Sequence, residues 1–239
     1  MQQIYTIPVN EAFDLCREKP ETGCPLCALY RKLQEDELDI ILGASMMEPD
    51  IRIMTNELGF CGTHYGMMLK RKRMLGMGLM LESHLAEVEA KLDAKWPPVV
   101  GAVGGNIEPL VKLGESCYVC SRIKKNLDAM TATTVYLFET DRAFREKFAA
   151  QSFFCLPHYS AMLSYASKKM NKKNYRELLE VAHGIEKKYI QSLSGDVSWF
   201  CKKFDYRYDA EPWYNSKDSI PRAIKFLSSD TDETKENGR

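Results

Sequence analysis

The sequence lacks the features that would place it in several common functional classes. No hydrophobic run approaches the roughly 20 residues of a membrane-spanning helix, so we expect no membrane association. Lys plus Arg and Asp plus Glu both number 33 among 239 residues, so no net charge draws the whole chain to nucleic acid or anionic lipid. Gly-rich phosphate loops, G-x-S-x-G and H-E-x-x-H are absent, which excludes the enzyme classes that these motifs mark.

The N-terminal segment also lacks the pattern of a signal peptide. It carries Glu11 and Asp14 and has no basic region followed by an apolar core. Hydrophobic residues make up 45% of the chain and charged residues 28%, which is typical of a globular protein. We therefore expect a cytoplasmic protein whose eight cysteines stay reduced, because that compartment disfavours disulfides.

Six of the eight cysteines fall into a repeated pattern. The four pairs are Cys24-x2-Cys27, Cys61-x2-His64, Cys117-x2-Cys120 and Cys155-x2-His158. The second half repeats the first at an offset of 93 to 94 residues, and Phe60 and Tyr65 recur as Phe154 and Tyr159. This regularity indicates an internal duplication.

Each copy offers three cysteines and one histidine, a usual ligand set for structural zinc. A Cys-x2-Cys pair turns both side chains toward one ion, and four protein ligands leave no open coordination position. If the pairs open helices, two positive helix ends also face the negatively charged centre. We predict two zinc ions, each held by the two pairs of one copy and clamping the base of a helical hairpin. An iron or iron–sulfur centre, a redox role for the first pair, and ordinary buried thiols are the alternatives. Cys16 and Cys201 remain, and both are expected to be packed core thiols.

Hydrophobic spacing predicts helices almost throughout. Expected helices cover residues 27–46, 51–58 (capped by Asp50) and 64–95 in the first copy, and 120–139, 142–150, 157–170 and 175–204 in the second. A break at 171–174 then divides what is one helix in the first copy. Ser216 is expected to cap a last helix, 217–228.

The resulting fold class is all-α, with two duplicated helical units that each contain a Cys3His zinc knuckle. The expected segments are a first zinc-helical repeat (1–95), a Pro/Gly-rich connection (96–116), a second repeat (117–204), a C-terminal loop and helix (205–228) and a disordered tail (229–239).

The knuckles, together with the ending that begins WFCKKFDYRYDAEPW, carry a resemblance. The sequence resembles an uncharacterised bacterial family, common in Firmicutes, over roughly residues 5–228. The resemblance implies the same duplicated fold and no assigned activity. The second copy lacks the proline that follows Cys24 in the first, which affects only the local turn.

Two further histidines, His84 and His183, lie on the helices that follow the Cys-x2-His pairs. Each has a glutamate three residues later, and Glu180 precedes His183 with the spacing of di-iron bundles, although the partner motifs of such a site are missing. We expect both histidines to be hydrogen-bonded residues at the repeat interface, and not an acid–base constellation with the loop 205–211. A ligand site at these residues is the alternative.

Two surface features each have two alternative interpretations. The basic run 70–73 is interpreted as a solvated face, with nucleic-acid contact as the alternative. The loop 205–213 is rich in charged and aromatic residues, and either folds back with Arg207 paired internally or forms a recognition surface.

Three functional hypotheses follow. The preferred one is a non-enzymatic, zinc-stabilised helical scaffold or interaction protein, with a protein partner favoured over nucleic acid. The alternatives are an enzyme or small-ligand binder with a pocket near His84, His183 and the C-terminal loop, and a nucleic-acid- or ribosome-associated zinc protein.

Overall fold

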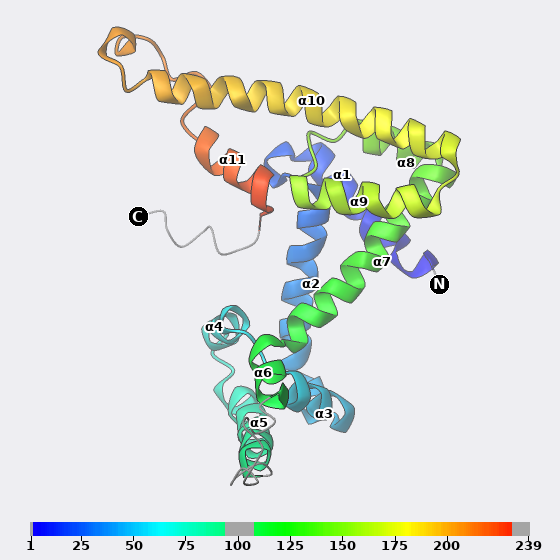
Figure 1. Cartoon of the computed structure of the whole chain (residues 1–239), viewed down its shortest axis with the longest axis vertical. Helices are drawn as coiled ribbons and strands as arrows, with labels where there is room; N and C mark the ends of the chain where they lie inside the picture. The colour runs from blue at the N-terminus through cyan, green and yellow to red at the C-terminus, as the bar shows by residue number, and fades with distance from the viewer. Residues whose placement is uncertain (1, 94–107, 231–239) are drawn as a thin grey trace, which may run out of the picture. The chain divides into compact units, whose positions relative to one another are not determined.

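The computed structural model describes residues 2–93 and 108–230, and these form helices joined by short turns (Figure 1). The described part contains no strand, so the predicted all-α fold is confirmed. None of its helices combines the length and the apolar character needed to cross a membrane. The α-helices are α1 (Thr6–Glu18), α2 (Pro25–Ile41), α3 (Pro49–Leu58), α4 (Gly62–Lys70), α5 (Met74–Asp93), α6 (Glu108–Glu115), α7 (Tyr118–Thr140), α8 (Arg142–Ala149), α9 (Leu156–Lys169), α10 (Lys172–Lys202) and α11 (Ser219–Ser228). Four short 3-10 helices accompany them: η1 (Gln2–Tyr5), η2 (Pro20–Thr22), η3 (Ala44–Met47) and η4 (Tyr206–Tyr208).

Both copies contain a broken helix after the Cys-x2-His pair, whereas the sequence predicts a break only in the second. The expected helix 64–95 is divided into α4 and α5 at Arg71–Arg73. Lys72 has a φ of 57°, and this left-handed conformation ends α4. Arg71 is held there by ion pairs to Glu35 and Asp39, so part of the basic run is neutralised within the protein.

Two of the expected helix caps are wrong. Pro49 is the first residue of α3, because its fixed φ suits that position, and extended Glu48 precedes it in place of Asp50. Helix α11 starts at Ser219, and Ser216 is instead buried in the preceding turn, where its hydroxyl donates to the carbonyl of Trp213 at 2.7 Å.

The expected connection 96–116 is described only in part. Residues 94–107 lie outside the described residues, and α6 forms residues 108–115.

The chain divides into two compact units. The first contains residues 1–31 and 127–239, and the second contains residues 32–126. Each unit therefore combines parts of both sequence repeats.

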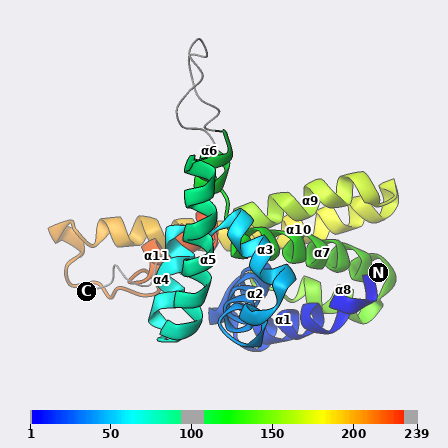
Figure 2. The same cartoon turned by 90° about the horizontal axis from the view of Figure 1, so that it is seen from below.

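In the first unit, α9 packs alongside α10, and α11 contacts both (Figures 1 and 2). Its core is an aromatic cluster in which every ring is nearly inaccessible to solvent. Phe148 is central to this cluster, with ring centroids 4.8–5.9 Å from three neighbouring rings. The cluster comprises Phe13, Phe138, Phe144, Phe148 and Phe154.

In the second unit, α3 and α6 pack against α5. Its core is aliphatic and rich in methionine, with Leu38, Ile41, Leu42, Met68 and Met80 all buried. Gly59 ends α3 with a φ of 56°, and a Cβ atom there would lie 3.0 Å from Nε2 of His84. The positive φ favours glycine, and a Cβ atom would also require the His84 ring to move.

Candidate metal centres

Eight side chains form two four-residue clusters, and within each cluster the ligand atoms lie within 4.8 Å of one another. The first cluster lies in the first unit and contains Cys24, Cys27, Cys155 and His158. Its three cysteines are buried, and the Nδ1 atom of His158 lies 3.8, 3.4 and 3.0 Å from the Sγ atoms of Cys24, Cys27 and Cys155.

The second cluster lies in the second unit and contains Cys61, His64, Cys117 and Cys120. The Nδ1 atom of buried His64 lies 3.1 Å from Sγ of Cys61 and 3.4 Å from each of the other two sulfurs. The main chain joins the two halves of this cluster, because Tyr118 N–H donates to the carbonyl of Gly59 at 2.9 Å.

The clusters correct the predicted pairing within each copy. In both clusters, the Cys-x2-Cys pair of one copy meets the Cys-x2-His pair of the other. The helix lengths agree with this crossed pairing. Helix α2 has 17 residues and α3 has 10, which correspond to about 26 Å and about 15 Å, so α3 alone does not span the length of α2. In the second copy the mismatch is larger, with 23 residues in α7 and 8 in α8.

All four pairs have the same local structure. The first cysteine of each pair immediately precedes a helix, and the second ligand is the third helical residue. The carbonyl of that first cysteine accepts the opening hydrogen bond of the helix in every case, at 2.8–3.1 Å. Two helix N-termini therefore meet at each cluster, as expected from the sequence. Their positive ends favour negative charge by about 0.3–1 kcal/mol each.

The donor geometry fits a tetrahedral ion of the size of zinc. Bond lengths of about 2.3 Å to sulfur and about 2.0 Å to nitrogen place two sulfurs about 3.8 Å apart, and a sulfur and a nitrogen about 3.5 Å apart. The Sγ atoms of Cys27 and Cys155 are separated by 3.5 Å, and those of Cys61 and Cys120 by 3.9 Å. Both clusters could thus hold a metal ion, and no cysteine among the described residues forms a disulfide.

A buried amide beside His64 supports this assignment. Gln34 is 3% exposed, and its Nε2 atom lies 3.2 Å from Nε2 of His64 while its Oε1 atom has no partner. If Nδ1 of His64 binds a metal, Nε2 carries the proton and needs an acceptor. A half-turn of the amide places Oε1 next to this N–H group, where the oxygen accepts from it.

Burial and the neighbouring ligand groups shift the pKa values of the clustered side chains in different directions. Burial and the neighbouring thiols Cys155 and Cys27 raise the pKa of Cys24 well above its usual value. Burial and the proximity of Cys117 raise the pKa of Cys120 to about 12. Hydrogen bonds from Cys24 and Cys27 lower the pKa of Cys155 instead. Burial lowers the pKa of His158, but Cys155 and Cys27 outweigh it and raise the pKa to about 9. A bound cation would favour the ionised thiols and neutral imidazole that act as ligands.

Further groups support the first cluster, and sequence reasoning missed them. Asp230 N–H donates to Sγ of Cys27 at 3.5 Å, and the hydroxyl of Ser229 lies 3.1 Å from Sγ of Cys155. The carboxylate of Asp230 pairs with Arg31 at 2.6 Å, which fixes the segment in place. Ser229 and Asp230 fall in the stretch expected to be a disordered tail, and the rest of that stretch lies outside the described residues.

Glu186 supports the same cluster from α10. Its Oε1 atom accepts a 2.6 Å hydrogen bond from the N–H of Phe154, next to Cys155. Burial raises the pKa of Glu186 to about 7. The sequence marks Glu186 only as the glutamate that follows His183 by three residues, and no sequence signal distinguishes Gln34 from other polar residues on amphipathic helices.

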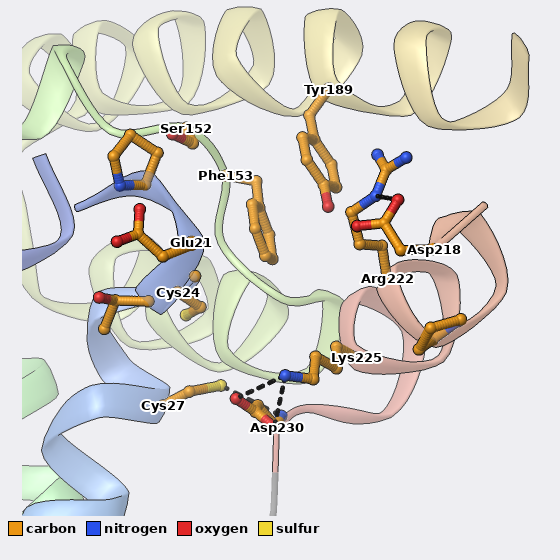
Figure 3. Close-up of a pocket in the computed structure, with 14 residues that line it drawn as sticks. Glu21, Cys24, Cys27, Ser152, Phe153, Tyr189, Asp218, Arg222, Lys225 and Asp230 are labelled. Atoms are coloured by element: carbon orange, nitrogen blue, oxygen red, sulfur yellow. Dashed lines mark hydrogen bonds and ion pairs between the residues drawn. The ribbon is translucent and has the colours of Figure 1, made fainter. Parts of the chain in front are cut away.

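A cavity of about 400 Å³ adjoins the first cluster (Figure 3). Cys24 and Cys27 line it together with Phe153 and Tyr189, whose rings are stacked with centroids 4.1 Å apart. Its main ionic groups are paired: Arg222 with Asp218 at 3.0 Å, and Lys225 with Asp230 at 3.4 Å. Neither His84 nor His183 lines this cavity.

The other candidate residues do not form a catalytic group within either unit. His84 lies in the second unit, where Nδ1 is 3.1 Å from the carbonyl oxygen of Asn56. His183 and Glu180 are exposed on α10 in the first unit, so the expectation of a packed histidine is wrong for His183. Cys16 is buried as expected, and burial raises its pKa to about 11, whereas Cys201 is exposed and not a core thiol.

The C-terminal loop has features of both alternatives, the loop that folds back on itself and the exposed recognition surface. Arg207 pairs with Asp205 at 2.6 Å, and buried Lys203 donates to three loop carbonyls at 2.7–3.1 Å. Phe204 and Tyr206 are nevertheless 76% and 84% exposed.

The comparisons with known proteins agree with the resemblance in the sequence. Searches of curated proteins and of solved structures found no match. A family model matches residues 1–234, and its description is a family of unknown function, DUF6062. The chain therefore belongs to the DUF6062 family.

Proposed function

We propose that each cluster binds one structural zinc ion and that the protein is a zinc-stabilised helical scaffold. The observation that carries this proposal is the pair of Cys3His donor sets with tetrahedral spacing. Zinc held by four protein ligands has no open position for water, so it contributes folding free energy and not hydrolytic chemistry.

The crossed pairing gives the ions a structural role. The first cluster joins residues 131 positions apart in sequence (Cys24 and Cys155), and the second joins residues 59 positions apart (Cys61 and Cys120). Closing such long loops costs conformational entropy, and a tetrahedral ion offsets that cost in the folded state. Three buried side chains orient the ligands or the main chain next to them: Gln34, Ser229 and Glu186.

Metal analysis of protein purified without a metal-affinity tag tests this proposal. We expect about two zinc ions per chain, with each complete donor set holding one. A zinc content near zero in reduced protein, or stoichiometric iron, would contradict it.

A variant series tests the structural role. Cys155→Ser should lose one zinc ion and part of its helicity, because the first cluster then lacks a ligand. Cys201→Ser is the matched control, since this cysteine is exposed and outside both clusters. If Cys155→Ser lost its zinc but kept the unfolding temperature of the control, the ion would not be structural.

For the scaffold's partner, we favour a protein over nucleic acid. Met74, Leu85 and Leu92 share one face of α5 and are 59%, 63% and 53% exposed, a pattern that suits an apolar partner surface. The strongest basic run is partly neutralised by the ion pairs of Arg71. Nucleic acid that co-purified with the protein, and whose binding weakened with added salt, would argue for the alternative.

A further inference from the structure

The two clusters differ in how far their sulfurs are exposed. In the first cluster all three cysteines are at most 2% exposed, and Ser229 and Asp230 make hydrogen-bond contacts with two of the sulfurs. In the second cluster only Cys117 is buried, Cys61 is half-buried and Cys120 is exposed. Sulfur in the second cluster is therefore more exposed to a small reagent than sulfur in the first, where Cys24 and Cys27 meet solvent only at the cavity that they line.

The two accessible sulfurs of the second cluster also lie next to each other. The Sγ atoms of Cys61 and Cys120 are 3.9 Å apart, and a disulfide bond brings two sulfurs to about 2.05 Å. Their segments are already joined by the Tyr118–Gly59 hydrogen bond and by Ser116, whose hydroxyl donates to the carbonyl of Leu58 at 2.8 Å. The main-chain segments next to the two cysteines are therefore already held together.

The packing around the two clusters also differs, and the second cluster is again the less buried one. Phe154, which precedes Cys155, is fully buried in the aromatic core of the first unit. Its counterpart Phe60, which precedes Cys61, is only half-buried and makes edge contacts with Tyr65 and Tyr118. The second cluster can lose its ion with less disturbance of a packed core.

We propose that the second cluster is a thiol oxidation site at which a hydroperoxide converts Cys61 and Cys120 to a disulfide and releases the metal, while the first cluster keeps its ion. This proposal rests on the proposed function, because both clusters must first bind metal.

The chemistry balances with hydrogen peroxide as the oxidant. The thiolate of Cys120 attacks one peroxide oxygen, the O–O bond breaks, and hydroxide leaves and takes up a proton to become water. Cys120 is then a sulfenic acid, and the thiolate of Cys61 attacks its sulfur and displaces the second hydroxide, which also becomes water. Two thiolates lose two electrons, and one peroxide is reduced to two waters with the uptake of two protons. His64 and Cys117 remain, which is too few ligands for a closed tetrahedral site.

The test uses the full-length, zinc-loaded protein. Its zinc content is measured first, so a protein without zinc contradicts the proposed function before any peroxide is added. Hydrogen peroxide is then added at a few equivalents, and released zinc, remaining thiols and disulfide-linked peptides are measured over time. We expect release of about half of the zinc, loss of two thiols and a peptide that links Cys61 to Cys120. A thiol reductant with added zinc should restore the starting state.

Two variants show which cluster responds. Cys27→Ser disrupts the first cluster, so its remaining zinc should be released by peroxide. Cys120→Ser disrupts the second, so its remaining zinc should resist. Three results would overturn the proposal. They are release of both ions from the wild-type protein at one rate, release of neither ion, and a disulfide that excludes Cys61 or Cys120. The wild-type peptide map alone decides the matter if either variant fails to fold.

Discussion

Replacing Gln34 by leucine should weaken the second metal centre and leave the first unchanged. Gln34 is 3% exposed and His64 is 2% exposed, so water cannot take the place of the amide. In Gln34→Leu, the Nε2–H group of a metal-bound His64 has no acceptor. A buried unpaired donor costs about 1–3 kcal/mol. This range agrees with the 10–100-fold loss of metal affinity, about 1.4–2.7 kcal/mol, that is typical when such a supporting group is removed.

The assay is a titration of zinc-loaded protein with a competing chelator of known affinity. We expect one zinc of Gln34→Leu to transfer at a 10–100-fold lower chelator concentration than in the wild-type protein, and the other at an unchanged concentration. Gln34→Glu should retain most of the affinity, because a carboxylate also accepts from Nε2–H.

Gln151→Leu is the matched control. This glutamine is 5% exposed and donates to the carbonyls of Phe13 and Lys147, so its loss should lower stability and leave both affinities unchanged. Equal weakening of both centres by Gln34→Leu, or no weakening of either, would refute the assigned role of Gln34.

Three further predictions concern the surroundings of the metal centres. Asp230→Ala removes the ion pairs to Arg31 and Lys225, so zinc in the first cluster should exchange faster with a competing chelator, whereas the exchange rate of the second cluster should not change. Lys203→Met leaves three loop carbonyls without their donor and should lower the local opening free energy of residues 204–211 by about 1.5–3 kcal/mol, measured by hydrogen exchange. Phe148→Ala should cost about 3–5 kcal/mol in denaturant unfolding, because the ring is fully buried, whereas Leu227→Ala at a 58% exposed site should cost less than about 0.5 kcal/mol.

The sequence is sufficient to predict the helical fold and the eight side chains that gather into two clusters. The predicted helices begin within one residue of the second ligand of each pair, and the structure starts them one or two residues earlier, directly after the first cysteine. The duplication was equally visible, because ligands and aromatic neighbours recur at one offset.

The partners within each cluster could not be predicted in the same way. Spacing shows that a pair can turn toward an ion, but not which other pair reaches that ion. The predicted helices 27–46 and 51–58 already differ in length, as α2 and α3 do, but which other pair reaches the ion depends on tertiary packing that the spacing does not encode. The break at Arg71–Arg73 was missed for a related reason. Lysine and arginine are good helix formers, and only the ion pairs of Arg71 with Glu35 and Asp39 reveal why the helix ends there.

The supporting residues were missed because their role arises in three dimensions. Gln34 lies seven residues after Cys27 on α2, yet it serves His64 in the other cluster. Ser229 and Asp230 stand at the start of a polar, charged segment whose composition indicates disorder, and only the fold brings them to Cys155 and Cys27.

The crossed arrangement is the central claim, and zinc counting in two double variants tests it most directly. Cys24→Ser with Cys155→Ser removes two ligands from one cluster, so about one zinc per chain should remain. Cys24→Ser with Cys61→Ser removes one ligand from each cluster, so both centres should be impaired and the tightly bound zinc should fall to nearly none. Pairing within each copy predicts the reverse, with one zinc retained by the second variant and none by the first, and that result would contradict the account.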